Sequence, residues 1–232
     1  MTTNQETEGC VPQLEALCRQ YGIDDWHARN SLRKPIYQRL TQSIISRIAS
    51  PTSRIVEIGC GIGDILLLLS DAGFRNITGI DEDQNVFNVA RQRILSTGKD
   101  FVHLLNQQYP CKLHETPDFL LLINCIYFDQ IESLDAFSIE LKRWMEFNGK
   151  PKAFLVELID SSYTSLEHTR LKGQSTEFNV FCRVSKEHVK SFFPGYSIFQ
   201  IPSSEPYRVP KTIYLISKQN FSEQVRDLMD PV

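Results

Sequence analysis

The stretch V-E-I-G-C-G-I-G-D occupies residues 56–64, and G-I-D follows at residues 79–81. An apolar run at 54–58 leads into a turn with glycine at every second position, and the apolar helix that follows can end at Gly73. Glycine has no Cβ, so such a turn lets the backbone approach a ligand closely, in front of the exposed N–H groups of a helix N-terminus. Asp81, at the end of the next predicted strand, is placed to accept hydrogen bonds from both ribose hydroxyls of a nucleoside.

The acid before the glycines separates two classes of ligand. The dinucleotide fingerprint is G-x-G-x-x-G, whereas this chain has G-x-G-x-G with Glu57 two residues before the first glycine. A carboxylate there repels a diphosphate and favours a ligand with a cationic amine or sulfonium. In these residues the chain resembles the class I S-adenosyl-L-methionine (SAM)-dependent methyltransferases, whose first motif is E/D-x-G-x-G-x-G and whose second ends in an acid. The resemblance is close over residues 54–90 and diffuse out to about residue 217.

The resemblance implies a SAM site at the ends of the first three strands. It would place the glycines under the methionine moiety and the ribose, Glu57 near the amino acid end, and Asp81 on the ribose hydroxyls. Glu82 or Asp83 would flank the adenine. Where the family often has an acid for the adenine amino group, this chain has amides, and Asn106 and Gln107 are equal candidates. The cofactor-binding residues predicted for this part are Glu57, Gly59, Gly61, Gly63, Asp81, Glu82, Asn106 and Gln107.

The end of the fourth predicted strand carries the candidate catalytic residues. Asn124 and Tyr127 form N-x-x-Y, which partly resembles the N/D-P-P-Y/F motif of amino-group methyltransferases but lacks both prolines. In small-molecule members of the family this position starts a helix, and Asn124 would then face the cofactor methionine or the substrate. Tyr163, just after the fifth predicted strand, is a comparable pocket candidate.

An aromatic and cationic segment precedes the glycine turn. In many relatives this region folds over SAM as a lid, in which a guanidinium can pair with the methionine carboxylate and an aromatic face can attract the sulfonium. Ordinary packing is the alternative role for the aromatic residues. His27 and His168 are candidate general bases, and no pair of histidines has metal-ligand spacing. The predicted lid residues are Tyr21, Trp26, Arg29, Arg33 and Tyr37, of which Tyr21, Trp26 and Arg29 are predicted to bind the cofactor.

Strands and helices alternate from residue 54 onward, which predicts an α/β fold with a doubly wound, mostly parallel sheet and helices on both faces. The resemblance implies seven strands ending in an antiparallel hairpin. We expect an N-terminal helical lid at 1–50, a Rossmann-like domain at 51–220 with a polar insertion near 160–180, and a C-terminal tail at 221–232.

Composition limits the remaining function classes. The net charge is −3 with basic residues dispersed, which argues against nucleic acid as the main partner. Six scattered cysteines without C-x-x-C spacing indicate neither a zinc site nor a disulfide framework. No targeting or membrane-spanning segment is visible. We therefore expect a cytoplasmic protein, a monomer or homodimer, with a small-molecule substrate and no metal, nucleic acid or membrane partner.

The resemblance implies a SAM-dependent methyltransferase acting on a small-molecule acceptor. Two alternatives stay open. One is attack at Cγ of SAM with release of 5′-methylthioadenosine, for example by cyclisation of the amine to azetidine-2-carboxylate. The other is a SAM-binding subunit without turnover.

Overall fold

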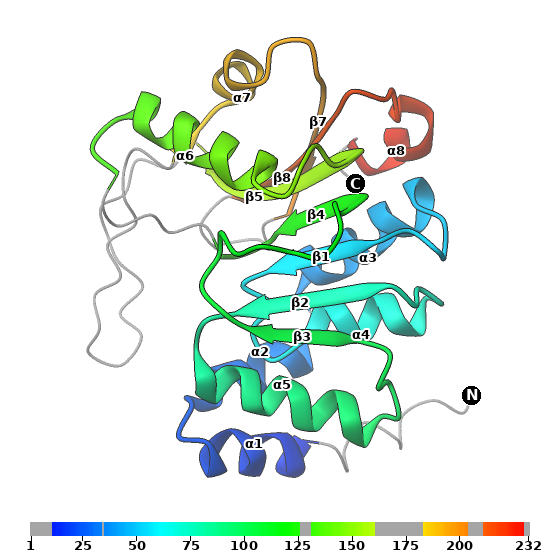
Figure 1. Ribbon diagram of the computed structural model, residues 1–232, viewed down its shortest axis with the longest axis vertical. Helices are drawn as coiled ribbons and strands as arrows, with labels where there is room; N and C mark the ends of the chain where they lie inside the picture. The colour runs from blue at the N-terminus through cyan, green and yellow to red at the C-terminus, as the bar shows by residue number, and fades with distance from the viewer. Residues whose placement is uncertain (1–10, 34, 126–130, 161–182, 204–210, 230–232) are drawn as a thin grey trace.

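The computed structural model describes residues 11–33, 35–125, 131–160, 183–203 and 211–229 (Figure 1). Three helices precede the sheet: α1 (Val11–Gln20), α2 (Asp25–Arg33) and α3 (Ile36–Ile48). The first half of the sheet region contains β1 (Ile55–Ile58), α4 (Asp64–Asp71), β2 (Ile77–Asp81), α5 (Gln84–Ser96) and β3 (His103–Asn106). The second half contains β4 (Phe119–Leu122), α6 (Leu134–Glu146), β5 (Ala153–Asp160), β6 (Arg183–Val184), α7 (Lys186–Phe192), β7 (Ser197–Pro202), β8 (Lys211–Ser217) and α8 (Ser222–Met229).

The strands form one sheet in the order β3-β2-β1-β4-β5-β8-β7, with the two-residue β6 paired beside the end of β5. The strands β1 to β5 are mutually parallel, and β8 is antiparallel to both β5 and β7. The chain moves outward from β1 in both directions, so the order reverses between β1 and β4. Open α/β sheets bind ligands in the crevice outside the carboxyl ends of the strands at such a point.

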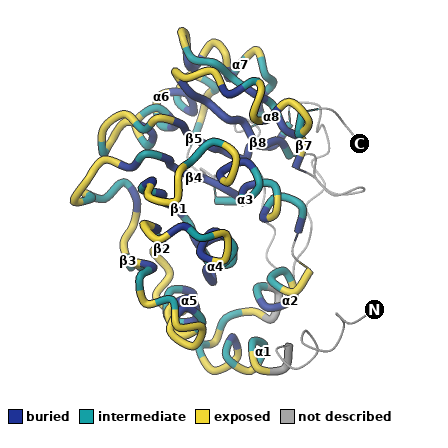
Figure 2. The backbone as a smooth tube through the Cα atoms, turned by 90° about the vertical axis from the view of Figure 1, so that its right-hand side faces the viewer, coloured by how far each residue is buried: buried dark blue, intermediate teal, exposed yellow. Residues whose placement is uncertain are grey.

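Helices cover both faces of the sheet. One hydrophobic core joins the sheet to α3, α4 and α8 through residues such as Ile44, Leu66 and Val225. The other joins it to α6 and α7 through Phe137 and Val189. The helices α1 and α2 pack at the α5 end of the molecule, away from α7 (Figure 1, Figure 2). The central strands are therefore buried on both sides, which explains continuously apolar runs such as Phe119–Leu122.

The predicted fold class is confirmed, including the final antiparallel hairpin. Within the described residues the structure adds β6 to the seven predicted strands. Asp83 caps α5 by accepting hydrogen bonds from the N–H groups of Asn85 and Val86. The α8 helix, in the segment predicted as a tail, contributes buried Val225 to the core. Most of the predicted insertion at 160–180 lies outside the described residues.

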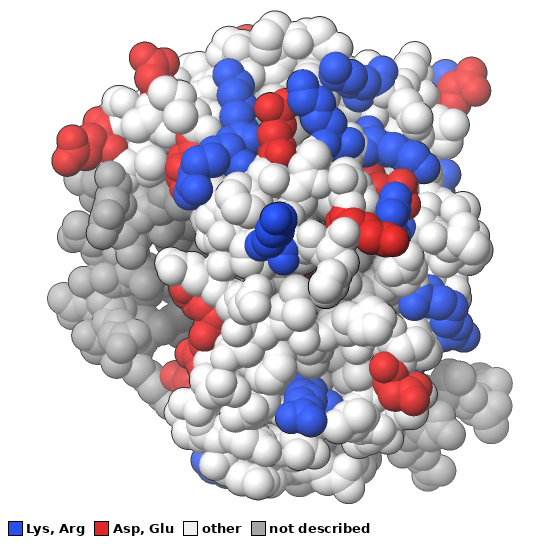
Figure 3. Space-filling view, in the orientation of Figure 1, with Lys and Arg blue, Asp and Glu red and all other residues white. Residues whose placement is uncertain are grey.

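Charges of both signs are mixed on the face shown in Figure 3, with Lys and Arg most frequent over its upper half. Acidic side chains gather at the left of the same view, where β2 and β3 end in Figure 1. No helix among the described residues has the length and apolar character that crossing a membrane requires.

Candidate cofactor site at the carboxyl edge of the sheet

The glycine turn between β1 and α4 has left-handed backbone at all three glycines. The φ angles of Gly59, Gly61 and Gly63 are 66°, 55° and 83°. A Cβ on Gly59 would lie 2.4 Å from the Cβ of Cys125, whereas a Cβ on Gly61 would meet no atom of the described residues within 4 Å. Gly59 is therefore required by packing against the segment after β4. At Gly61 the described part of the chain instead leaves the turn open, which suits the close approach of a ligand.

Asp81, the last residue of β2, fixes the conformation of this turn. Its Oδ2 accepts a hydrogen bond from the N–H of Gly61 at 2.8 Å, and its Oδ1 accepts one from the N–H of Asp83 at 3.0 Å. Burial raises the pKa of the Asp81 carboxyl, and the two N–H groups act in the opposite direction. A carboxylate has about four lone-pair positions, so both oxygens can still accept a hydrogen bond from a ligand hydroxyl.

The amides at the end of β3 have different environments. Asn106 donates through Nδ2 to the backbone oxygens of Asp81 at 2.9 Å and Glu82 at 3.2 Å. The side chain of Gln107 is exposed, as is that of Glu82, while the Gln107 N–H donates to the carbonyl of Asp81 at 3.1 Å. Asn106 therefore ties the ends of β2 and β3 together, and Gln107 is the amide whose side chain faces solvent.

Glu57 on β1 is buried beneath the turn. Its side chain is on the same sheet face as Ile55, and only 2% of the residue is exposed. Within the described part of the chain Oε2 has no hydrogen-bond partner. Burial, followed by the negative charges of Asp64 and Asp81, raises the pKa of the Glu57 carboxyl well above its usual range. A cationic group placed beside it would relieve this cost.

A second polar group lies across β4, within β5 and at the start of β8. Glu157 is 4% exposed and accepts a hydrogen bond from the hydroxyl of Ser203 at 2.6 Å. The ammonium of Lys211 lies 3.6 Å from Oε2 of Glu157 and donates to Oδ1 of Asn124, whose backbone has a φ of 55°. Of the predicted catalytic residues, Asn124 is therefore held by a cation from β8.

Sequence reasoning missed Glu157, Lys211 and Ser203. The available signal was one acid inside the apolar strand A-F-L-V-E-L-I-D at residues 153–160, because a charged residue in a strand buried on both faces needs a partner.

Tyr37 and Cys125 complete this neighbourhood. Burial raises the pKa of Tyr37 to about 12, although its hydroxyl accepts a hydrogen bond from Asn30 at 2.8 Å, and the charge of Glu157 adds to that rise. Burial and the charge of Glu57 raise the pKa of the Cys125 thiol.

The predicted lid residues have separate positions. Tyr21 packs beside the small core formed by α1, α2 and α5, and Tyr37 packs against the main core. Arg29 is exposed, with its guanidinium 4.0 Å from the carboxylate of Asp24. Trp26 belongs to α2. Burial lowers the pKa of His27, while the carboxylates of Asp81 and Asp64 act in the opposite direction.

Tyr127, Tyr163 and His168 lie outside the described residues. No cluster of metal-ligating side chains is found among the residues that are described. A hollow of about 330 Å³ lies between α5 and the segment 100–104, with Phe87, Ile94 and Leu104 in its lining. None of its lining residues belongs to the glycine turn, so we assign the site from the strand ends.

Comparison with solved structures identifies the fold as that of class I SAM-dependent methyltransferases. Magnesium protoporphyrin IX methyltransferase (ChlM) from Synechocystis PCC 6803 with bound SAH matches with a TM-score of 0.60 and 12% identity, over 91% of this chain and 97% of that chain. The N-methyltransferase NodS from Bradyrhizobium japonicum WM9 matches with a TM-score of 0.56 and 12% identity, over 78% and 92%. The methyltransferase domain of bacterial CtHen1-C matches with a TM-score of 0.56 and 20% identity, over 79% and 98%.

No family profile matches the chain, and no curated protein sequence matches it. At these identities the likeness establishes the shared fold. The assignment of ligand and reaction depends on the site itself.

Proposed function

We propose that the protein binds SAM at the carboxyl edge of β1, β2 and β3 and is a SAM-dependent methyltransferase with a small-molecule acceptor. The observation that carries the proposal is the pairing of Asp81 with the open glycine turn. Its carboxylate holds Gly61 in place and keeps lone pairs for two ribose hydroxyls, while the missing Cβ of Gly61 leaves room for the nucleoside.

Glu57 supports SAM over a nucleoside diphosphate. A buried carboxyl oxygen without a partner among the described residues is costly, and a ligand with an ammonium or sulfonium group would remove that cost. When bound, SAM supplies a methyl group on a sulfonium that already has its leaving group. The protein then has mainly to orient both partners and exclude water.

The remaining predicted contacts are part of the same proposal. Asn106 would act chiefly by fixing the ends of β2 and β3, and the exposed side chains of Gln107 and Glu82 would contact the adenine end. Tyr21, Trp26 and Arg29 belong to the proposed lid, with Tyr163 and Tyr127 as further pocket residues. The cytoplasmic location and the monomer or homodimer remain predictions from the sequence.

The acceptor would bind on the β4–β5 side of the cofactor. There Oδ1 of Asn124 accepts a hydrogen bond from the ammonium of Lys211. The oxygen is therefore occupied by a cation and is not presented to a target amine. This differs from the role of the polar residue in N/D-P-P-Y/F motifs. It supports a small-molecule acceptor other than the amino groups for which that motif is typical.

A second reaction is favoured by the position of Glu57 at the proposed amino acid end of the ligand. Above its raised pKa the ionised Glu57 carboxylate is a stronger base than an ordinary carboxylate and can accept a proton from the ammonium of SAM. The free amine can then attack Cγ of the same molecule, forming the N–Cγ bond as the Cγ–S bond breaks. That reaction would release 5′-methylthioadenosine, whereas methyl transfer releases S-adenosylhomocysteine (SAH).

The test is to incubate the purified protein with SAM, alone and with a panel of hydroxyl, thiol and amine acceptors, and to identify the adenosine products by mass spectrometry. We expect SAH once an acceptor is supplied. Catalytic methylthioadenosine without an acceptor would instead establish attack at Cγ, and neither product despite SAM binding would indicate a binding subunit.

The matched variants are Asp81→Ala and, as a control, Asp100→Ala at an exposed aspartate. Loss of a charged acceptor for two hydroxyls should weaken SAM binding by at least about tenfold in the first variant and not in the second. Calorimetric titration with unchanged affinity in folded Asp81→Ala would exclude the nucleoside position proposed here.

A further inference from the structure

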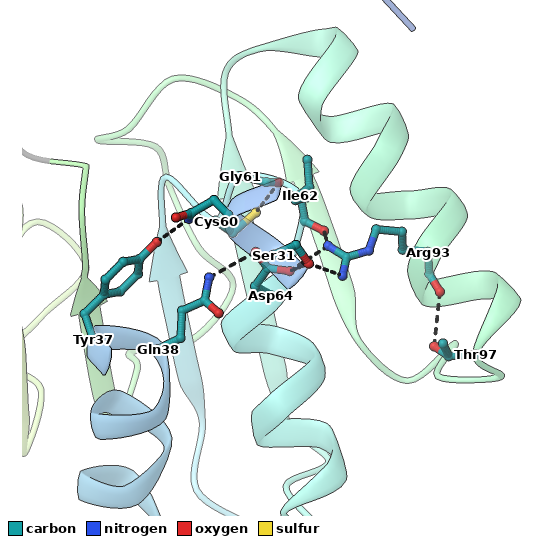
Figure 4. Close-up of polar contacts among 10 residues, drawn as sticks. Ser31, Tyr37, Gln38, Cys60, Gly61, Ile62, Asp64, Arg93 and Thr97 are labelled. Carbon is teal, nitrogen blue, oxygen red and sulfur yellow. Dashed lines mark hydrogen bonds and ion pairs between the residues drawn. The ribbon is translucent and has the colours of Figure 1, made fainter. Parts of the chain in front are cut away.

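One carboxylate joins the N-terminal helices to the glycine turn. Asp64, the first residue of α4, follows Gly63 directly, and its carboxylate accepts hydrogen bonds from two other helices (Figure 4). Ser31 on α2 donates to Oδ1 at 2.6 Å, and Gln38 on α3 donates to Oδ2 at 3.0 Å. Among the described residues no side chain caps the start of α4. The carboxylate is thus used to bind neighbouring helices and not to cap its own.

Arg93 on α5 completes this network from the opposite side (Figure 4). Its guanidinium donates to Oδ1 of Asp64 at 2.8 Å, to the carbonyl of Ile62 at 2.6 Å and to the hydroxyl of Ser31 at 3.0 Å. The side chains of Arg93 and Asp64 are only 16% and 15% exposed. Partial burial and the opposite charges make these hydrogen bonds stronger than ordinary surface contacts.

The residue held by Arg93 lies inside the turn itself. Ile62 stands between Gly61 and Gly63, whose backbones are both left-handed. Its side chain is 3% exposed and packs in a small core with Cys18 of α1, Ala28 of α2 and two valines of α5. Both the carbonyl and the side chain of Ile62 are therefore fixed by elements outside the sheet.

We propose that Arg93 and Asp64 are positioning residues that couple the docking of α1–α3 to the binding of SAM. The inference rests on the proposed function, since it assigns these residues to the cofactor turn. With the network intact, Gly61 presents its open side to the ligand and its N–H to Asp81. When the network is broken, the turn is released at Ile62 and the ligand has to reorder it, which lowers affinity. By reciprocity, a bound ligand favours the docked helices.

The test is calorimetric titration of SAH into Arg93→Lys, with Arg91→Lys as the matched control on the exposed side of the same helix. Lysine keeps the charge but cannot reach three acceptors in the geometry of a guanidinium. We expect the dissociation constant to rise about tenfold in Arg93→Lys and to stay unchanged in Arg91→Lys. Ser31→Ala should give a smaller rise, and in the double variant the two effects should be less than multiplicative, because both residues act in one network.

Hydrogen exchange separates positioning from simple stabilisation. In the wild type, saturating SAH should slow exchange in Asp25–Arg33, and in saturated Arg93→Lys this protection should be largely lost. Arg93→Lys could instead have a lower free energy of unfolding but unchanged SAH affinity and unchanged protection. That result would overturn the proposed coupling and leave the proposed function standing. A folded wild type that binds neither SAM nor SAH would overturn the proposed function and this inference together.

Discussion

The two halves of the carboxyl edge are built differently. On the β1–β2–β3 side, polar groups are held by backbone: Asp81 accepts from two N–H groups, and Asn106 donates to two carbonyls. On the β4–β5–β8 side, Glu157, Lys211 and Asn124 hold one another through side chains from strands far apart in the sequence. The first half depends on local chain geometry, and the second on the register of the sheet.

This difference agrees with the proposal that the β1–β2–β3 side binds the cofactor and the β4–β5–β8 side binds the acceptor. A nucleoside with fixed shape suits a site made of backbone and a contiguous motif, and such a site can recur in many proteins with the same fold. An acceptor differs from one enzyme to another, so side chains on separate strands can change its site without altering the cofactor turn.

Lys211→Met should have the largest effect, because it leaves Glu157 buried beside a neutral side chain. Removing one partner of a buried ion pair typically costs about 3–5 kcal/mol in the free energy of unfolding. Urea unfolding at pH 7 measures it, with Lys112→Met at an exposed lysine as the control. The double variant Glu157→Gln/Lys211→Met should recover part of the loss. If Lys211→Met were as stable as Lys112→Met, the β4–β5–β8 side would not depend on the ion pair between Glu157 and Lys211.

Gly59→Ala should come next, since Gly59 is where the two halves touch. Its new Cβ would meet the Cβ of Cys125 at 2.4 Å, and its φ of 66° disfavours any side chain. We expect a loss of about 3 kcal/mol from overpacking and backbone strain together. Gly61→Ala has the strain without the clash, so it should lose only about 1 kcal/mol while weakening SAM binding. Equal stability losses in the two variants would contradict this distinction.

Glu57→Gln should change the pH dependence of stability. The raised pKa of Glu57 means that the folded state binds its proton more tightly than the unfolded state. The protonated Glu57 therefore contributes fully to the free energy of unfolding of the wild type below the ordinary pKa of 4.5. As the pH rises from there toward the pKa of the folded state, this contribution falls by about 1.4 kcal/mol per pH unit. Glutamine cannot ionise, so the variant should be the more stable protein at alkaline pH.

The measurement is the free energy of unfolding from pH 5 to pH 9, with the exposed Glu132→Gln as control. Curves for Glu57→Gln and wild type that stay parallel over this range would show that the Glu57 carboxyl is not held neutral by burial.

The sequence predicted the sheet well because its signals are local. Alternating apolar runs and glycine turns set β1 to β5 and their helices, and Asp81 could be assigned because it follows a strand directly. The α2 helix was not predicted as a separate element. Among its described side chains only Ala28 is fully buried, and its polar contacts with Asp64 and Arg93 form only in the folded chain.

The second half of the edge could not be assembled from the sequence. Glu157 and Lys211 meet because β5 and β8 pair antiparallel with Glu157 opposite Ile213 and Ile159 opposite Lys211. That register is set by the packing of both sheet faces, which no short motif records. Asn124 was predicted from its position at a strand end, but its partner comes from a strand that starts at residue 211.

The smallest effect should separate the two amides at the end of β3. Asn106→Ala removes two hydrogen bonds to the carbonyls of Asp81 and Glu82, so we expect a loss of about 1 kcal/mol in the free energy of unfolding. Gln107→Ala removes an exposed side chain and should leave stability unchanged. If Gln107 contacts the adenine as proposed, its variant should bind SAM about fivefold more weakly at wild-type stability. Calorimetry measures the SAM affinity of both variants, and urea unfolding measures their stability. A stability loss in Gln107→Ala, or none in Asn106→Ala, would show that the hydrogen bonds of Asn106 do not hold the end of β3.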